Sequence, residues 1–546
     1  MEALQKTLRD KPAVRWFVLV LISMLMFSTY WFQDFFSGLK GLMESEMGFS
    51  SSEFGRMIGL TTIANVFGMI IVGGIMLDKW GIRIAGIVFG GLATLGATIT
   101  ALASYGFFGE SHSTQLTMMI IGRIMFGSGL EVVCVVATRT IVKWFKGYEL
   151  ALAMAINMGF GRLGSAMGIA LSIDVGGGSV PPAVAFAATL IGITLIIFLI
   201  YTVFDIKLDR QMGVTSQGSG EDFKFEDLVK LITNKSFLYI ALLCVSFYAA
   251  VFPFIQYAPD LMVNKFGFSY NLPESAEYFS IFGSVSLGNA LIFIGLFIFG
   301  ISFSMIPAQM KTTGAKILSL LIIFALFVAF IGSLWGTISL WLKNGPKTAS
   351  LIPMGTILFT PIFGSYIDRK GKAASVMILG SLLLIFAHIS LSLFNSVILG
   401  YLGLLSLGIA FSLVPAAMWP SVAKIVQESR LGTAYATMFT IQNIGLLAFF
   451  WGIGKVLDIV NPEVVAKLDS ARDTLESQGL SSVEVSERIT EMRVLGEIPP
   501  YNYFVPIFML VILGVISIFL SLQLKKADAK QGYGLELPFG NLKEEA

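Results

Sequence analysis

The feature that most constrains this chain is a succession of apolar runs, each about 20 residues long, which is the length a helix needs to cross a bilayer. The runs lack the alternation of apolar and polar residues that marks the strands of a membrane barrel. Of the 546 residues, 55% are hydrophobic and 13% are charged, whereas a soluble domain carries about 25% charge. We therefore predict an all-α protein that crosses a membrane many times.

The apolar runs divide into six spans, a polar linker and eight further spans, which makes about 14 in all. The division predicts an N-terminal six-helix bundle over 1–204, a linker over 205–236, a C-terminal bundle over 237–528 and a tail over 529–546. The second half has two spans more than the six of the first half, near 287–342, and we call these two spans the extra pair. A polar loop over 459–500 is predicted to form two surface helices of mixed charge.

Lys and Arg side chains predict the orientation of these spans. If the N-terminus lies inside, most of the basic residues fall in inside segments, among them Lys79, Lys143, Lys311 and Lys525. Short cytoplasmic loops carry such an excess of Lys and Arg. We expect both termini and the linker on the cytoplasmic side and the 459–500 loop outside.

Two loops in different halves share the pattern Gly-x-x-x-Asp-[Lys/Arg]-x-Gly with a basic residue after it: "GGIMLDKWGIR" and "FGSYIDRKGK". Glycine permits positive φ and close helix approach, and the aspartate can cap a helix or pair with a basic residue across the interface of the halves. Equivalent turns in two halves indicate a duplicated transporter. We expect these loops to hold an outward-open state. Their residues are Gly74, Asp78, Lys79, Gly81 and Arg83, then Gly364, Asp368, Arg369, Gly371 and Lys372.

This repeated loop resembles the major facilitator superfamily, and the resemblance covers essentially the whole chain apart from the extra pair and the 459–500 loop. It implies two six-helix bundles joined by the linker, with a central site at mid-membrane and alternating access by rocking of the halves. The extra pair departs from the pattern of twelve spans. We expect it to pack outside the bundle as a peripheral hairpin, with a docking surface for an accessory partner as the alternative.

Two charges interrupt the apolar spans. Glu131 lies in "GSGLEVVCVV" and Arg162 in "GFGRLGSAMG". Counting from the turn that joins their spans places both at about 18–20 Å, at 1.5 Å per residue. A charge at this depth costs at least about 2.5 kcal/mol, so a partner is required.

Two interpretations of these charges remain open. Glu131 and Arg162 form a salt bridge that locks two helices together, or they bind the ammonium and the carboxylate of a zwitterionic substrate, which then supplies both missing partners. An unpaired Glu131 could also carry a proton.

Several further stretches occur in both halves and in a consistent order: "GRIMFGSGLE", "VKWFKGYEL", "GFGRLGS", "FYAAVFPFI", "NKFGFS", "AMWPSVA" and "RLGTAYATMFTIQNIG". Together they resemble the family of lysosomal dipeptide uniporters, the major facilitator superfamily domain-containing protein 1 family. The resemblance implies passive transport of dipeptides recognised by their termini, with Glu131 and Arg162 at the positions that contact those termini. No acidic dileucine sorting signal is visible near the N-terminus, so we favour a bacterial inner membrane over a lysosomal one.

Other polar and aromatic side chains in the spans have both a functional and a structural interpretation. As functional roles we predict substrate contact for Tyr30, Tyr248, Trp419, Gln442 and Asn443, and a proton-relay or gating role for Arg123 and Asp34. The structural alternatives are helix capping or solvent exposure for Asp34, bonding to backbone carbonyls for Arg123, core packing for the aromatic residues and interhelical hydrogen bonds for the two amides.

Several signatures are absent from the sequence. It contains no Gly-rich loop ending in Lys-Ser/Thr, no His-Glu-x-x-His and no Cys-x-x-Cys, so we expect no ATP drive, no cofactor, no metal and no enzymatic activity. A net charge of +2 gives no indication of nucleic-acid binding. The main prediction is a dipeptide facilitator; a proton-coupled organic anion transporter of the same superfamily and a non-transporting sensor or scaffold are the alternatives.

Overall fold

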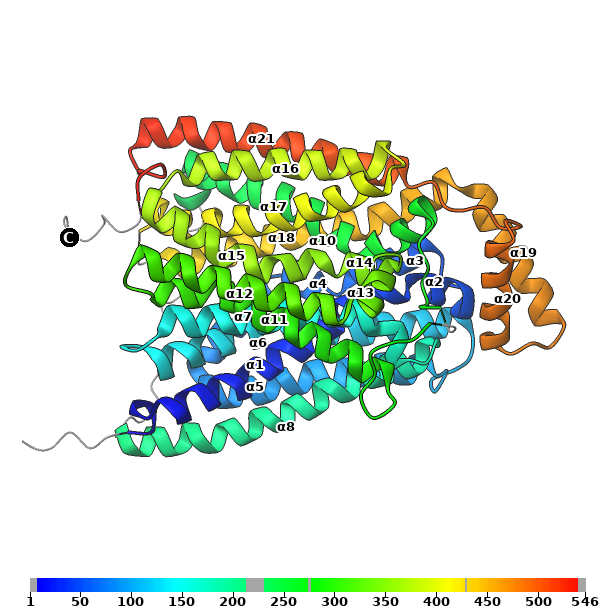
Figure 1. Cartoon of the computed structure of the whole chain (residues 1–546), viewed down its shortest axis with the longest axis horizontal. Helices are drawn as coiled ribbons and strands as arrows, with labels where there is room; N and C mark the ends of the chain where they lie inside the picture. Colours follow the sequence, from blue (N-terminus) through cyan, green and yellow to red (C-terminus); the bar gives the residue numbers. More distant parts are fainter. Residues whose placement is uncertain (1–6, 213–229, 274–275, 428–429, 539–546) are drawn as a thin grey trace, which may run out of the picture.

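A computed structural model of the chain describes residues 7–212, 230–273, 276–427 and 430–538. Its long helices run roughly side by side in one direction (Figure 1). The first helical turn, η1 (Leu8–Asp10), and the end of the last helix, α21 (Phe504–Gln531), lie at one end of the molecule, on the left of Figure 1. We call this the termini end. The opposite end carries α19 (Pro462–Ser477) and α20 (Ser482–Val494), and we call it the α19–α20 end.

The first half of the chain consists of η1 and eight α-helices. These are α1 (Pro12–Asp34), α2 (Phe36–Met47), α3 (Ser51–Leu60), α4 (Ile63–Val66), α5 (Met69–Ser104), α6 (His112–Phe145), α7 (Leu150–Val175) and α8 (Val180–Met212). The predicted linker begins at 205, but α8 continues to Met212, so the boundary at 204 falls inside a helix. Residues 213–229 of that linker lie outside the described residues.

Among the described residues, the second half contains α19, α20, α21 and nine other helices labelled in Figure 1. These are α10 (Lys235–Phe266), α11 (Val285–Gln309), α12 (Thr313–Ser333), α13 (Trp335–Trp341), α14 (Gly345–Ala349), α15 (Leu351–Lys370), α16 (Ala373–Leu393), α17 (Val397–Ile425) and α18 (Leu431–Val460). The 459–500 loop forms a pair of surface helices, α19 and α20, as predicted.

The prediction of an all-α membrane protein is confirmed. Among the described residues, twelve helical segments are long and apolar enough to cross a membrane. α5 counts once among them although Gly81 breaks it, and α7, with 26 residues, is not among the twelve. Fourteen spans therefore remain a prediction, to which the break in α5 and the length of α7 are favourable.

The second predicted span is broken rather than continuous. The chain leaves the helix after α3 and again at Gly68, which adopts φ 82. Arg123 of α6 donates from Nε to Thr61 Oγ1 (3.0 Å) and from Nη1 to the carbonyl of Phe32 (3.0 Å). These bonds fasten α1 and the first break in the second span to α6.

The two repeated loops share one backbone feature. Gly81 adopts φ 74 and Gly371 adopts φ 68, the region that glycine occupies without a steric penalty. A Cβ on Gly371 would lie 2.4 Å from the carbonyl carbon of Leu537, because the end of the chain folds back over this turn. Positive φ therefore explains Gly81 and Gly371, whereas Gly74 and Gly364 have no positive φ and no neighbouring atom within 4 Å of a Cβ placed there.

The aspartates of the two loops do not meet across the halves in this structure. Asp78 pairs with Arg139 of α6, in its own half. Arg83 reaches Asp209 of α8 at 2.9 Å, also in its own half. Among the described residues, no ion pair involves Asp368. Both loops lie toward the termini end, where the predicted lock of an outward-open state is not formed.

The halves meet at the α19–α20 end. Lys40 of α2 pairs with Asp260 of α10 at 2.9 Å, and both side chains are buried. The backbone N–H of Ser52 donates to Asp458 Oδ2 of α18 at 2.7 Å. Within the described part of the chain, the hydrogen bonds and ion pairs between the two halves lie at this end or at mid-depth. The molecule is closed at the α19–α20 end, while no such bond joins its halves at the termini end.

The extra pair consists of α11 and α12. α12 lies outermost and packs on α11 through rings such as Phe327 and Phe299, whose centroids are 5.5 Å apart. α11, however, contacts both α7 of the first half and α15 of the second half. α11 therefore contacts both halves while most of its apolar stretch stays exposed, as does that of α12, and the peripheral placement of the pair stays a prediction.

Candidate functional site

Glu131 lies near the middle of α6 and is half-buried. The first half places small residues around it: a Cβ on Gly127 would lie 1.9 Å from the carbonyl oxygen of Thr61, so α6 approaches the broken second span closely. No hydrogen bond or ion pair to Glu131 occurs among the described residues. Its carboxylate is therefore a charge at mid-depth without a protein partner in this state.

Arg162 lies near the middle of α7 and is also half-buried. Its guanidinium carbon is 4.3 Å from the centroid of the Phe411 ring on α17, so the arginine of the first half faces an aromatic ring of the second. A cation above a ring face is stabilised by about 0.5–2 kcal/mol, less than a carboxylate in an ion pair would provide. Within the described residues, Arg162 makes no ion pair with an acidic side chain.

Tyr30 of α1 joins the surroundings of the two charges. It lies within electrostatic range of Glu131, Arg162 and Asp34. A Cβ on Gly161, the neighbour of Arg162, would be 3.3 Å from the Tyr30 ring. The ring therefore packs against α7 beside Arg162. The salt bridge that we considered between Glu131 and Arg162 is not formed in this structure.

Asp34 is buried, which overturns the expectation that it faces solvent. Ser165 of α7 donates to its Oδ2 at 2.5 Å, and Gln256 of α10 donates from Nε2 to its Oδ1 at 2.8 Å. These bonds tie α1 to both halves just toward the α19–α20 end of the site. Asp34 thus belongs to the closure, a place consistent with the gating role.

Arg123 is fully buried, with the bonds to Thr61 and Phe32 described above. Its guanidinium carbon also lies 4.8 Å from the ring centroid of Phe36. These contacts match the structural interpretation, in which Arg123 bonds backbone and packs against rings.

Aromatic side chains from the second half form the wall opposite the charges. Trp419 donates from Nε1 to the Tyr248 hydroxyl at 2.8 Å. Tyr248 stacks on Phe252 at 5.4 Å, and Phe252 lies 5.2 Å from Phe411. The cluster brings Tyr248 and Trp419 together as candidates. Sequence reasoning missed Phe252 and Phe411, because nothing in a run of apolar residues distinguishes a ring that faces Arg162, as Phe411 does, from a core ring.

The two amides of α18 have protein partners. Gln442 accepts from Cys244 Sγ at 3.3 Å, and Asn443 donates to the carbonyl of Phe439 in its own helix at 2.8 Å. Thr62 donates to the carbonyl of Asn443 at 3.5 Å. Both side chains are buried; the Gln442 bond connects α18 to α10, the Asn443 side chain bonds within α18, and the structure does not bring either amide to the two charges.

A cavity of about 130 Å³ adjoins Arg162. Its walls come from α7, α15 and α17, as the superfamily resemblance implies for a central site, and also from α11 of the extra pair. The contributions of α11 are Ile301, Ser304 and Met305. Apart from Arg162 the lining is mostly apolar. Such a cavity can hold an apolar group next to a negative group bound by the arginine.

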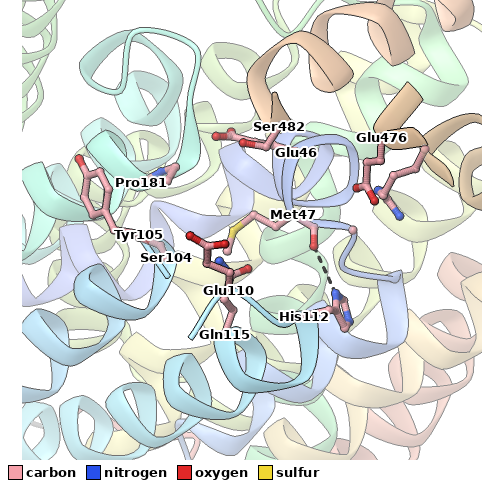
Figure 2. Close-up of a pocket in the computed structure, with 12 residues that line it drawn as sticks. Glu46, Met47, Ser104, Tyr105, Glu110, His112, Gln115, Pro181, Glu476 and Ser482 are labelled. Carbon is pink, nitrogen blue, oxygen red and sulfur yellow. Dashed lines mark hydrogen bonds between the residues drawn. The ribbon is translucent and has the colours of Figure 1, made fainter. Parts of the chain in front are cut away.

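A larger cavity of about 760 Å³ lies at the α19–α20 end (Figure 2). Figure 2 shows His112 directed at the carbonyl of Met47, to which its Nδ1 is bonded at 3.2 Å. Glu46, also on its wall, already accepts from Ser179 and from the backbone of Val180. This cavity is polar and lies away from the mid-membrane charges, so we do not assign the substrate site to it.

Comparisons with known proteins bear on the family of the chain and on its fold. The profile described as Major Facilitator Superfamily matches residues 17–343. The human protein "Lysosomal dipeptide transporter MFSD1" is 26% identical over 463 residues, which cover 82% of this chain and 81% of that protein. The zebrafish protein of the same name (Danio rerio) is 23% identical over 456 residues, 81% and 80% of the two chains.

Two solved structures share the fold. A bacterial homolog of the human lysosomal transporter Spinster, in an inward-facing and occupied conformation, superposes with a TM-score of 0.57 at 12% identity and covers 94% of this chain and 97% of its own. The nucleoside transporter NupG superposes with a TM-score of 0.53 at 14% identity, covering 93% and 98%. At such identities the likeness concerns the fold alone.

Proposed function

The chain belongs to the major facilitator superfamily, and from this premise we propose that it carries dipeptides across its membrane by facilitated diffusion. Glu131 binds the N-terminal ammonium group of the peptide and Arg162 binds its C-terminal carboxylate. The observation that carries the proposal is the state of these two side chains: both lie at mid-depth beside Tyr30, and neither has an oppositely charged partner among the described residues.

The energetics favour a ligand with both charges. A charge left without a partner in the membrane interior is costly, and a zwitterion satisfies both side chains in one event. The distance between the two termini of a dipeptide hardly depends on its side chains. Recognition by the termini therefore accepts many sequences, and the aromatic wall of Tyr248, Phe252 and Phe411 supplies apolar surface for them.

Transport follows from rocking of the two halves about this site. In the structure the α19–α20 end is closed by Lys40, Asp260 and Asp458. We assign the termini end to the cytoplasm, because Lys and Arg gather in its loops. The described state then faces inward. The opposite state requires the Lys40–Asp260 pair to separate, and we infer that Asp78 and Asp368 find partners across the halves in that state.

The test is counterflow in liposomes. The purified full-length protein is reconstituted, the vesicles are loaded with unlabelled Ala-Ala, and entry of labelled Ala-Ala is followed. We expect entry without a pH gradient and no change when a protonophore is added, whereas Arg162→Ala vesicles remain at the level of empty liposomes. The control is Arg488→Ala, which removes an exposed arginine of α20 that lies outside the site.

Other results would select another function. Accumulation that requires an inward proton gradient would replace uniport by proton coupling, with Glu131 as the proton carrier. Entry of organic anions but not of Ala-Ala would remove the dipeptide assignment and favour the organic anion transporter. Binding of dipeptides without any entry would indicate a sensor.

A further inference from the structure

The helix α11 belongs to the extra pair, yet it lies against the cavity of the candidate site. Gly159 of α7 lets it approach: a Cβ there would be 3.0 Å from the Phe297 ring of α11. On the other side, a Cβ on Gly300 of α11 would lie 3.1 Å from Ile357 of α15. Glycines on both surfaces thus allow α11 to sit between the two halves, with close packing on each.

Polar bonds fix this helix at the α19–α20 end. Asn289 of α11 is fully buried and donates from Nδ2 to Asp174 Oδ2 of α7 at 3.0 Å. Lys347 of α14 reaches the same carboxylate at 3.0 Å. One aspartate therefore holds α7, α11 and the second half together, and a buried bonded network of this kind sets a helix in one position.

From this anchor α11 runs down to the level of Arg162. There Ile301, Ser304 and Met305 form one wall of the cavity of about 130 Å³ that Arg162 adjoins. An apolar cavity of about 150 Å³ is large enough to bind benzene. The space beside the guanidinium therefore fits one medium-sized apolar side chain, and the wall that limits it comes from the extra pair.

We propose that this cavity is a specificity subsite for the side chain of the peptide's C-terminal residue, with Ile301, Ser304 and Met305 of the extra pair setting its size. The argument rests on the proposed function, in which Arg162 binds the C-terminal carboxylate. The side chain of that residue is attached to the same Cα as the carboxylate, so it enters the space next to Arg162. The N-terminal side chain does not reach it.

The experiment compares binding of Gly-Gly, Gly-Leu and Leu-Gly to purified full-length protein by isothermal titration. We expect Gly-Leu to bind at least about tenfold more tightly than Gly-Gly, since about 1.4 kcal/mol of burial corresponds to a factor of ten, and Leu-Gly to bind like Gly-Gly. Ile301→Trp fills the cavity and is expected to abolish the preference for Gly-Leu while Gly-Gly still binds. Ile298→Trp is the matched control, because Ile298 is 57% exposed on the same helix.

A second variant keeps the test decisive if Ile301→Trp does not fold. Met305→Ala enlarges the same cavity, and we expect this variant to shift the binding preference from Gly-Leu toward Gly-Trp. Equal affinities for Gly-Gly and Gly-Leu in the unaltered protein would overturn the subsite. An unchanged ratio of these two affinities in both variants would overturn it too. Both results are also those expected if a lipid chain fills the cavity. Failure of Gly-Gly to bind at all would instead overturn the proposed function.

Discussion

Two regions of this molecule differ in whether their charged side chains form ion pairs. At the α19–α20 end, charges from distant parts of the chain are paired. Lys40 meets Asp260 at 2.9 Å, and Arg493 meets Glu44 at 2.7 Å with further donation to Glu44 from the Tyr501 hydroxyl. The pairs connect the first half with the second half and with α20, so they hold this end closed.

At mid-membrane the charges are not paired. Glu131 and Arg162 lie in the same surroundings, but neither has an ion-pair partner among the described residues. A pair that is already formed has no need of a ligand, whereas an unpaired charge gains from one. The paired charges hold the α19–α20 end closed, whereas in the proposed function the unpaired charges bind the substrate.

The first prediction concerns the removal of one member of an ion pair at the closed α19–α20 end. Lys40→Met leaves Asp260 buried without its cation, although the Tyr270 and Tyr503 hydroxyls still donate to it. Loss of one partner of a buried pair costs about 3–5 kcal/mol. We expect a fall of this size in the free energy of unfolding, measured in mixed detergent micelles.

The double variant Lys40→Met with Asp260→Asn is the control for that prediction. It removes both charges, so most of the lost stability should return. A single variant as stable as the unaltered protein would show that the pair does not stabilise the closed end.

The second prediction concerns Arg162→Ala. The variant removes a charge-assisted bond to the carboxylate, which is worth about 2–3 kcal/mol, and we expect a loss of dipeptide affinity of about 30- to 150-fold. Without peptide, its thermal stability should equal or exceed that of the unaltered protein, because no ion pair is broken. A large fall in stability instead would mean that Arg162 has a structural partner and that the two regions do not differ.

The third prediction is a smaller loss from Glu131→Gln. The amide oxygen still accepts a hydrogen bond from the ammonium group, so only the charge is lost. We expect the dipeptide affinity to fall about tenfold, or by about 1.4 kcal/mol, as measured by isothermal titration. An unchanged affinity would remove Glu131 from the binding site.

The smallest effect is expected at the termini end, where ion pairs stay within one half. Glu149 accepts from Arg15 at 2.8 Å but is about half exposed. A backbone N–H and then the Arg15 guanidinium hold the pKa of Glu149 below its ordinary value of 4.5. Because the folded pKa is lowered, the pair stabilises above pH 4.5 and its contribution disappears as the pH falls through the lowered value.

Thermal melts of Glu149→Gln test this. The variant should melt slightly below the unaltered protein at pH 7, and the two should converge in acid. A gap that widens in acid would contradict the assigned sign.

Much of this arrangement was predictable from local sequence. Apolar run lengths give the helices, and counting residues from the turn between α6 and α7 places Glu131 and Arg162 at equal depth. The glycines of the repeated loops were predictable too, since Gly81 and Gly371 both adopt positive φ. Each of these inferences needs only the geometry of one helix or one turn.

What escaped prediction depends on contacts between distant segments. Glu44 and Arg493 are 449 residues apart, and no pattern in the sequence links them. Asp34 ends its helix and reads as a cap, but Ser165 and Gln256 approach from two other helices and bury it. The hydrophobicity of α11 predicts that it lies in a membrane, but it does not predict which helices α11 packs against.

The most direct test of the central claim compares a free dipeptide with its blocked forms on the unaltered protein. Thermal stability is measured with Ala-Ala, N-acetyl-Ala-Ala and Ala-Ala amide, since a ligand that binds the folded state raises stability. We expect Ala-Ala to raise the melting temperature, and we expect blocking of either terminus to abolish this shift. An equal shift with either blocked peptide would contradict it, because one of the two charges would then have no role in binding.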